Sequence, residues 1–229
     1  TRLAMSKGLW RDLRVLEHLD KHFDEAGRSG VLYVLSTEIG PGRPSDAARS
    51  MEAEYGWPAV HREGYPDLTG LEVDFYRSVV TFNAQSRAIK VVFVNQFGWS
   101  RDRCGARMPE DMEFMDIRKG SDVEFGMSVY EPFGIAQVEP LSFGAICLIS
   151  NVCGCAGFVA RATDGEDVPN VLVADYTDLG SGYTGVDGVT HIGWAERDAI
   201  ERRNTVDVAK ALYERLPTTD AESETMLKR

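Results

Sequence analysis

The chain has 229 residues and a formal net charge of −11, with 43% hydrophobic and 10% aromatic residues. This length and apolar content suit one large domain with a packed core. The acidic balance argues against general nucleic-acid binding, which needs clustered Lys and Arg. No stretch approaches the length of a membrane span, and the N-terminus shows no charged-then-apolar signal pattern. We therefore expect neither a membrane span nor a nucleic-acid partner.

The first predicted helix runs over residues 9–26, where leucines recur at helical spacing. A continuous apolar run over residues 31–36 then predicts a strand that is buried on both faces of a parallel sheet. Residues 37–66 are rich in glycine, proline and charge, which favours a loop or a short mobile helix. The next two predicted elements are a helix over residues 67–86 and a strand over residues 89–95.

The second half of the chain continues the alternation of helices and strands. Its predicted elements are a helix over 108–120, strands over 122–128, 145–150 and 171–174, a short helix after Gly134, a glycine-rich loop over 180–193, a final helix over about 195–216 and a polar tail. Strands that alternate with helices predict an α/β fold with a Rossmann-like, doubly wound parallel sheet.

The four cysteines are too few to form a disulfide framework in a chain of this length. Reduced thiols are therefore expected, and the predicted location is cytoplasmic. Cys153 and Cys155 flank a glycine, but no histidine or further cysteine follows at ligand spacing, so close backbone approach at a helix start is favoured over a metal or redox pair. His18 and His22 share a spacing of four, and a solvated helix face is favoured over a metal site.

The segment from Tyr130 to Glu139, which reads YEPFGIAQVE, carries the clearest chemical signal. Glu131 and Glu139 flank a Pro-x-Gly turn and the start of an apolar helix, with predicted strands on both sides. Such a βαβ unit forms a binding crevice at the carboxyl ends of parallel strands. Free N–H groups near Gly134 suit a phosphate, and carboxylates accept hydrogen bonds from sugar hydroxyls. The pattern fits a nucleotide sugar better than it fits two ordinary surface carboxylates near a helix start.

A second candidate feature is the pair of cations Arg2 and Lys7 near the N-terminus. The chain begins with Thr1, and residues 1–4 look like the end of a strand, so we expect a fragment with sequence upstream. Both cations would then lie at the carboxyl edge of the sheet, where they can neutralise a pyrophosphate and stabilise it as it leaves. The alternative is a solvated, frayed terminus.

Together, these features resemble the C-terminal donor-binding domain of retaining glycosyltransferases with the GT-B fold. The residues that carry the resemblance are Arg2, Lys7-Gly8, Asp122, Tyr130-Glu131-Pro132-Phe133-Gly134, Glu139 and Gly144. Three stretches look like glycogen synthases: the Arg…Lys-Gly opening, residues 151–158 and residues 169–175. The resemblance covers roughly residues 1–175, and residues 1–229 are interpreted as one donor-binding domain.

The resemblance implies that Arg2 and Lys7 bind the donor's phosphates and that Glu131 contacts the transferred sugar. These three are the predicted catalytic residues. The predicted donor-binding residues are Asn95 and Gln96 near the base, Phe133, Gly134 and Ile135 in the turn, and Glu139 at the ribose or a nearby sugar hydroxyl. Pro140 directly after Glu139 removes a helix N–H, so the helix is expected to begin late or bend there.

The implied reaction is sugar transfer with retained anomeric configuration, without a protein nucleophile or a cofactor. The departing phosphate would act as base for the acceptor hydroxyl. No Asp-x-Asp pair occurs in the chain, so no metal is expected. GT-B enzymes work in a cleft between two domains, so the glycan acceptor would be bound by an N-terminal domain outside this chain, and the fragment alone is expected to be inactive.

The favoured function is therefore glucosyl transfer from UDP-glucose or ADP-glucose to a growing α-glucan. Two alternatives stay open. One is another retaining glycosyltransferase that makes a small glycoside or a different glycan. The other is a non-catalytic nucleotide-sugar-binding module. The sequence does not distinguish UDP from ADP as the carrier.

Overall fold

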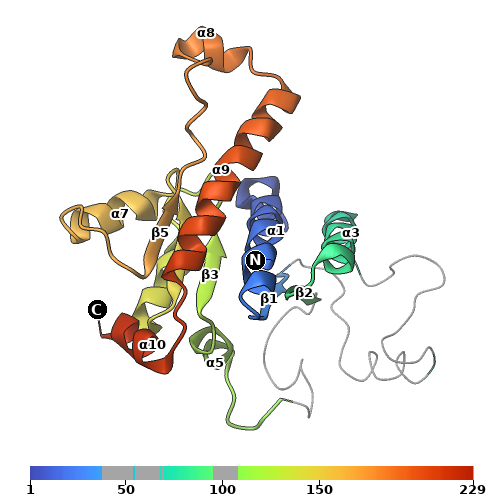
Figure 1. Ribbon diagram of the computed structural model, residues 1–229, viewed down its shortest axis with the longest axis vertical. Helices are drawn as coiled ribbons and strands as arrows, with labels where there is room; N and C mark the ends of the chain where they lie inside the picture. Colours follow the sequence, from blue (N-terminus) through green and yellow to red (C-terminus); the bar gives the residue numbers. More distant parts are fainter. Residues whose placement is uncertain (38–53, 55–67, 69, 95–107, 229) are drawn as a thin grey trace. The chain divides into compact units, whose positions relative to one another are not determined.

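The computed structural model describes residues 1–37, 54, 68, 70–94 and 108–228. The chain divides into two compact units (Figure 1). The first unit comprises Thr1–Ala4 and Ser29–Gly120, and the second comprises Met5–Arg28 and Ser121–Arg229. The interpretation of residues 1–229 as one donor-binding domain stays a prediction.

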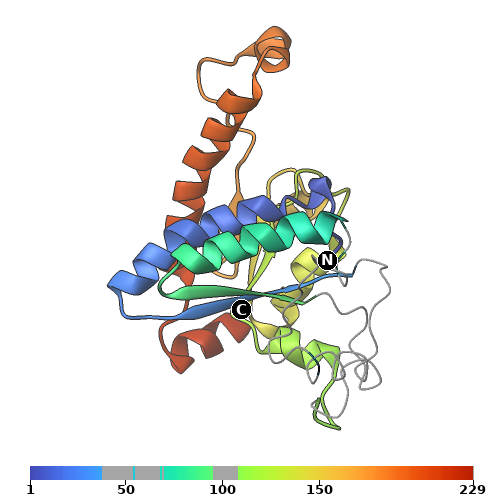
Figure 2. The same ribbon diagram turned by 90° about the vertical axis from the view of Figure 1, so that its right-hand side faces the viewer.

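The first unit is built on two parallel strands, β1 (Gly30–Leu35) and β2 (Ile89–Val94), which pair in register along their whole length. Helix α3 (Gly70–Gln85) precedes β2 in the chain and packs along it (Figure 2). A parallel pair needs such a crossover because no tight hairpin can join its strands. Helix α5 (Phe114–Lys119) also belongs to this unit and is shorter than the helix predicted over 108–120.

Strand β1 is not buried on both faces, so that prediction is wrong. Val31 and Tyr33 are 52% and 55% exposed, whereas Val34 is buried. Among the described residues β1 pairs only with β2. A continuous apolar run records the composition of a strand, but it does not record how many layers of structure cover that strand.

The second unit contains a three-stranded parallel sheet in the order β3 (Val123–Gly126), β4 (Ile146–Ser150), β5 (Val171–Ala174). All five residues of the central strand β4 are buried. Between β3 and β4 the chain forms the short helix α6 (Ile135–Val138) and the 3₁₀ turn η3 (Glu139–Phe143). Helix α7 (Gly154–Ala162) connects β4 to β5.

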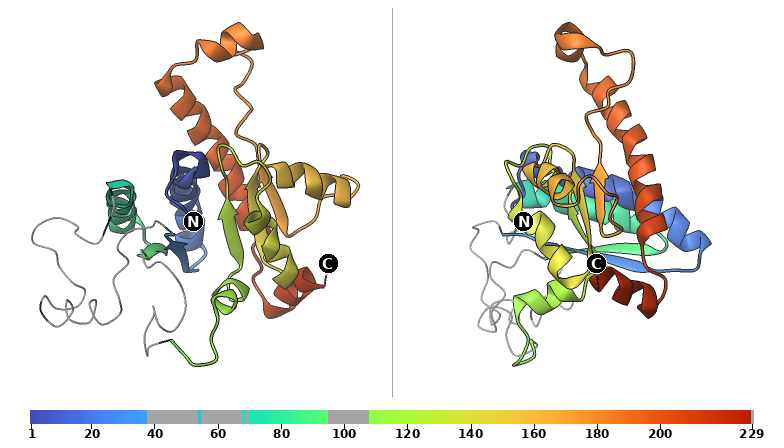
Figure 3. Two further views of the ribbon diagram at one scale, coloured as in Figure 1. Left: turned by 180° about the vertical axis from the view of Figure 1, so that it is seen from behind. Right: turned by 90° about the vertical axis from the view of Figure 1, so that its left-hand side faces the viewer.

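Four further helices and one short turn complete the second unit. They are η1 (Met5–Lys7), α1 (Leu9–Glu25), α8 (Gly185–Thr190), α9 (Trp194–Arg215) and α10 (Asp220–Leu227). Helix α1 packs against the long helix α9, and α10 lies beside η3 (Figure 3). Among the residues that the structure describes, no helix combines the length and the apolar character needed to cross a membrane.

Helices α8 and α10 were not expected, because residues 180–193 were predicted as a loop and the residues after 216 as a polar tail. Thr219 caps α10, and its hydroxyl accepts a hydrogen bond from the N–H of Glu222. Threonine followed three residues later by glutamate is the sequence signature of a helix start, so the signal for α10 was present. The glycines around α8 favoured a loop, so the sequence did not indicate this six-residue helix.

The predicted α/β class with parallel strands is confirmed and is consistent with a Rossmann-like arrangement. One feature differs from the expectation of one doubly wound sheet. Within the described ranges, the five strands form a two-stranded and a three-stranded sheet.

A buried cation joins several elements of the second unit. Arg11 of α1 is 1% exposed, and its guanidinium donates hydrogen bonds to the carbonyl oxygens of Met127 (3.3 Å) and Ser128 (3.2 Å). It also pairs with the carboxylate of Glu201 on α9 at 2.7 Å and lies over the ring of Tyr176 at 4.0 Å. Arg11 therefore ties α1 and α9 to the segments that follow β3 and β5.

We predict that Glu201→Gln destabilises the chain at neutral pH by about 3 kcal/mol, because it leaves Arg11 buried without its counter-charge. Burial by itself would raise the pKa of Glu201, but the hydrogen bonds from Arg11 and Trp10 outweigh it and hold the pKa below its usual value. A depressed pKa means that the pair stabilises the fold above pH ~4.3 and that this contribution is lost as the pH falls through the folded-state pKa.

Urea unfolding from pH 7 downward measures this effect. The difference in the free energy of unfolding between the wild type and Glu201→Gln should narrow as the pH falls below about 4.3. Glu214→Gln is the matched control, because Glu214 is exposed on the same helix and should change the free energy of unfolding by less than about 0.5 kcal/mol. A gap that stays constant with pH would contradict the assignment.

Candidate functional site

Two of the predicted site residues meet in the second unit. The ammonium Nζ of Lys7 forms an ion pair and hydrogen bond with Oε2 of Glu131, although 124 positions separate the two residues. The side chains are 29% and 18% exposed, so both are partly accessible to a ligand. The pair lies where the chain leaves β3 at its carboxyl end, which is where ligands bind in parallel α/β sheets.

Backbone contacts hold Lys7 in this place. The carbonyl oxygen of Ser6 accepts hydrogen bonds from the N–H groups of Val129 (2.8 Å) and Tyr130 (3.3 Å). Gly8 has a φ of +66°, and a Cβ there would lie 2.6 Å from the carbonyl oxygen of Met127. Only glycine fits both the left-handed backbone and this close approach. Gly8 is thus needed for the chain to turn from η1 into α1 directly against the segment that leads to Glu131.

The turn after Glu131 is fixed by the start of α7. Glu131 and Cys153 form an isolated parallel bridge, and the carbonyl oxygen of Glu131 accepts from the N–H of Gly154 at 3.2 Å. The carbonyl oxygen of Phe133 accepts from the N–H of Cys155 at 2.8 Å. Gly134 closes the turn with a φ of +88° and caps α6. The βαβ geometry expected around this motif is therefore present.

The other predicted residues of the motif are more exposed. Phe133 packs edge-to-face against Phe158 of α7, with ring centroids 5.8 Å apart, and Ile135 points largely into solvent. Glu139 is exposed and begins η3. Pro140 stands in the first turn of η3, where the helix that starts at Ile135 gives way to a 3₁₀ turn. The expected late start of the helix is not observed, because α6 begins directly after Gly134.

Three other predicted site residues do not belong to the described part of the second unit. Arg2 belongs to the first unit and is exposed, so its action together with Lys7 stays a prediction. Residues 1–4 are not a strand, although the terminal amine of Thr1 donates a hydrogen bond to the carbonyl oxygen of Leu35 at 2.6 Å. Asn95 and Gln96 lie outside the described residues.

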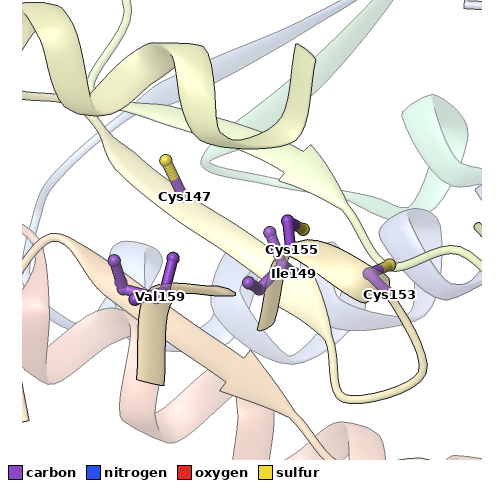
Figure 4. Close-up of a cluster of buried hydrophobic side chains, with 6 residues drawn as sticks. Cys147, Ile149, Cys153, Cys155 and Val159 are labelled. Atoms are coloured by element: carbon purple, nitrogen blue, oxygen red, sulfur yellow. The ribbon is translucent and has the colours of Figure 1, made fainter. Parts of the chain in front are cut away.

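The cysteines of the second unit are packing residues. Cys147 and Ile149 of β4 meet Cys155 and Val159 of α7, and Cys153 lies at the start of that helix (Figure 4). Burial raises the pKa of the Cys155 thiol to about 11 and also raises the pKa of Cys153. Both thiols are therefore protonated at neutral pH and poor as nucleophiles or metal ligands. Among the described residues, no cluster of His, Cys, Asp or Glu could hold a metal ion.

Sequence reasoning missed the side chains that support the ion pair, chiefly Arg11 and Gln137. The amide nitrogen of Gln137 donates to the carbonyl oxygen of Gly126 (2.8 Å) and to the hydroxyl of Ser128 (3.0 Å). Nothing in the sequence separates Arg11 from an exposed cation of the same helix, because its partners lie far away in the chain. Gln137 was visible as the one polar side chain inside the apolar helix start IAQV.

We predict that Gly154→Ala disturbs the turn that carries Glu131. A Cβ at residue 154 would lie 2.0 Å from the carbonyl oxygen of Pro132, and backbone cannot yield as a flexible side chain can. We expect a loss of about 1–3 kcal/mol in the free energy of unfolding, measured by thermal or urea denaturation. Gly157→Ala is the control in the same helix, since its Cβ would meet only the guanidinium end of Arg161 at 3.6 Å. The control should be neutral or stabilising by up to about 1 kcal/mol, and equal losses in both variants would contradict the close approach.

The chain is similar to a curated protein and to a solved structure. No family model matches the chain. Over 143 residues it is 27% identical to the glycogen [starch] synthase of Dictyostelium discoideum, which covers 60% of this chain and 16% of that protein. The crystal structure of Anabaena HepE in complex with UDP-glucose aligns over 93% of this chain and 50% of its own, with 14% identity and a TM-score of 0.31, which is too low to establish a shared fold. The chain thus spans only 16% of the length of the curated relative and is similar to a glycogen synthase within that stretch.

Proposed function

We propose that this chain carries the nucleotide-sugar donor site of a retaining, glycogen-synthase-like glycosyltransferase with the GT-B fold. The single observation that carries the proposal is the ion pair of Lys7 with Glu131 beside a glycine turn at the carboxyl end of β3. The sequence similarity to a glycogen synthase supports the same reaction class. The proposed reaction transfers glucose from UDP-glucose or ADP-glucose to an α-glucan.

The ion pair is suited to exchange partners when a donor binds. A partly exposed pair contributes only about 0–1 kcal/mol, so separating it costs little. A diphosphate carries more negative charge than the carboxylate and offers the Lys7 ammonium several oxygen acceptors. Glu131, once released from Lys7, can accept hydrogen bonds from the hydroxyl groups of the transferred sugar. The same two side chains would thus recognise both halves of a nucleotide sugar.

In the proposed mechanism, the bond between the anomeric carbon and the phosphate oxygen breaks while the acceptor hydroxyl attacks from the same face. The anomeric configuration is retained because the new bond forms on the face from which the phosphate leaves. The acceptor proton passes to the departing phosphate. Lys7, together with Arg2, stabilises the charge that grows on the phosphate as it leaves. The reaction needs neither a metal ion nor a protein nucleophile.

The remaining proposed contacts surround this pair. Phe133, Gly134 and Ile135 would lie along the donor, Glu139 would reach the ribose or a sugar hydroxyl, and Asn95 with Gln96 would approach the base. The glycan acceptor would be held by a separate N-terminal domain, so transfer would require the longer protein. A cytoplasmic location fits both the donor and the reduced cysteines.

We predict that the chain binds UDP or ADP in calorimetric titration without added metal, and that chelator does not weaken this binding. Lys7→Met should raise the dissociation constant of the diphosphate about tenfold to a hundredfold, because one charge-assisted hydrogen bond is worth about 1.5–3 kcal/mol. Lys210→Met is the matched control, since Lys210 is exposed on α9 and should leave the affinity unchanged.

Glu131→Gln separates the two proposed roles. Removing this carboxylate frees Lys7, so the affinity for UDP alone should hold or increase. The affinity for UDP-glucose relative to UDP should fall, because the sugar loses its charged acceptor. The donor-site assignment is wrong if the folded protein binds neither diphosphate. It is also wrong if the Lys7→Met variant binds the diphosphate with wild-type affinity. Binding by a longer, two-domain protein that shows no transfer would instead favour the non-catalytic module.

A further inference from the structure

Gln137 belongs to α6, the single helical turn that follows Glu131 and Gly134 in the chain. Its side chain is half-buried and turns back toward the end of β3. The amide nitrogen donates to the carbonyl oxygen of Gly126 at 2.8 Å and to the hydroxyl oxygen of Ser128 at 3.0 Å. The amide oxygen accepts from the Cys155 thiol, with the sulfur 3.6 Å away. One side chain therefore forms hydrogen bonds both to the end of β3 with the residues just after it and to the start of α7.

The space around Gln137 is closed by two glycines. A Cβ at Gly126 would lie 2.7 Å from Cγ of Gln137, and a Cβ at Gly134 would lie 2.1 Å from its Oε1. The N–H of Gln137 also donates to the carbonyl oxygen of Gly134 at 3.0 Å. The backbone at these two glycines thus packs closely against the half-buried side chain, which restricts its movement.

Simple satisfaction of an unpaired carbonyl does not explain these bonds. The carbonyl oxygen of Gly126 already accepts from the N–H of Ser128 at 2.8 Å. A methionine would fill nearly the same volume as Gln137 without polar atoms. The amide instead fixes the geometry of the segment that follows β3. Its nitrogen donates to two points of that segment, and its oxygen accepts from Cys155 of α7.

The segment between β3 and Glu131 is held from two sides. On one side, Arg11 binds the carbonyl oxygens of Met127 and Ser128. On the other side, Gln137 binds Gly126 and the Ser128 hydroxyl. The side chain of Glu131 leaves the chain just beyond this clamped segment, so its direction depends on both holds.

We propose that Gln137 is a positioning residue for the donor site, which aims the Glu131 carboxylate at the sugar through Gly126, Ser128 and the Gly134 turn without touching the donor. This inference rests on the proposed function and adds to it the residue that sets sugar recognition. The diphosphate would depend on it less, because Lys7 comes from η1, whose contacts with this segment are made to the backbone of Met127, Val129 and Tyr130 and not to Gln137.

The test compares the ratio of the dissociation constants for UDP and UDP-glucose in the 229-residue chain and its variants. If the wild type prefers ADP, then ADP and ADP-glucose replace them. Gln137→Met removes all the hydrogen bonds at nearly constant volume, and Gln137→Glu keeps the shape but, when ionised, cannot donate. We expect both variants to lower the preference for the sugar-bearing ligand about tenfold, which corresponds to one well-placed hydrogen bond, while the affinity for UDP alone changes less than about threefold.

Asn204→Leu provides the control for a loss of stability alone. Asn204 is a buried amide on α9 that donates to the carbonyl oxygen of Asp178 at 3.2 Å. This control should lower the melting temperature and leave the ratio at its wild-type value. A ratio within about twofold of wild type in folded Gln137→Met or Gln137→Glu, or an equal change in Asn204→Leu, overturns the inference. A wild-type chain that binds no diphosphate overturns the proposed function itself, and the role of Gln137 falls with it.

Discussion

The buried guanidinium of Arg11 is the interaction on which the second unit depends. Removing a cation from water costs several kcal/mol, and this cost is offset only when charge and hydrogen-bond partners surround it. Glu201 supplies the opposite charge, Met127 and Ser128 supply carbonyl oxygens, and Tyr176 offers its ring face. These partners come from the last long helix and from the segments that follow two strands. Other arrangements of these helices and strands would leave the charge of Arg11 buried without a partner, so this cluster disfavours them.

The proposed donor site is a weak surface pair whose two residues are placed by the backbone around them. The attraction between Lys7 and Glu131 contributes little to stability because both side chains are partly solvated. Their positions are set instead by backbone hydrogen bonds, which are made by Ser6 next to Lys7 and by Gly154 to Glu131. A site that is held by its scaffold can give up its internal ion pair to a phosphate without losing its shape. The donor-site proposal requires this: the backbone holds the two residues in place, so their side chains are available to bind a ligand.

Local features of the structure could be predicted and remote ones could not. The alternation of strands and helices and the Pro-x-Gly turn follow from residues close together in sequence, and the structure has them. The exposed face of β1 was missed because burial depends on what covers a strand. Helix α10 was missed although Thr219 and Glu222 carry the pattern of a helix start. Arg2, Asn95 and Gln96 keep their predicted roles only as predictions.

By itself, the sequence determined the α/β class, the motif from Tyr130 to Glu139 and the candidate chemistry of its carboxylates, since periodicity and turn residues act over a few positions. Only the tertiary structure decided which cation meets Glu131, which arginine is buried and which glutamine hydrogen-bonds to the end of β3 and to α7. Lys7, Arg11 and Gln137 each find partners from other elements of the fold. Such pairings depend on packing across the sheet and between helices, and no pattern along the chain records them.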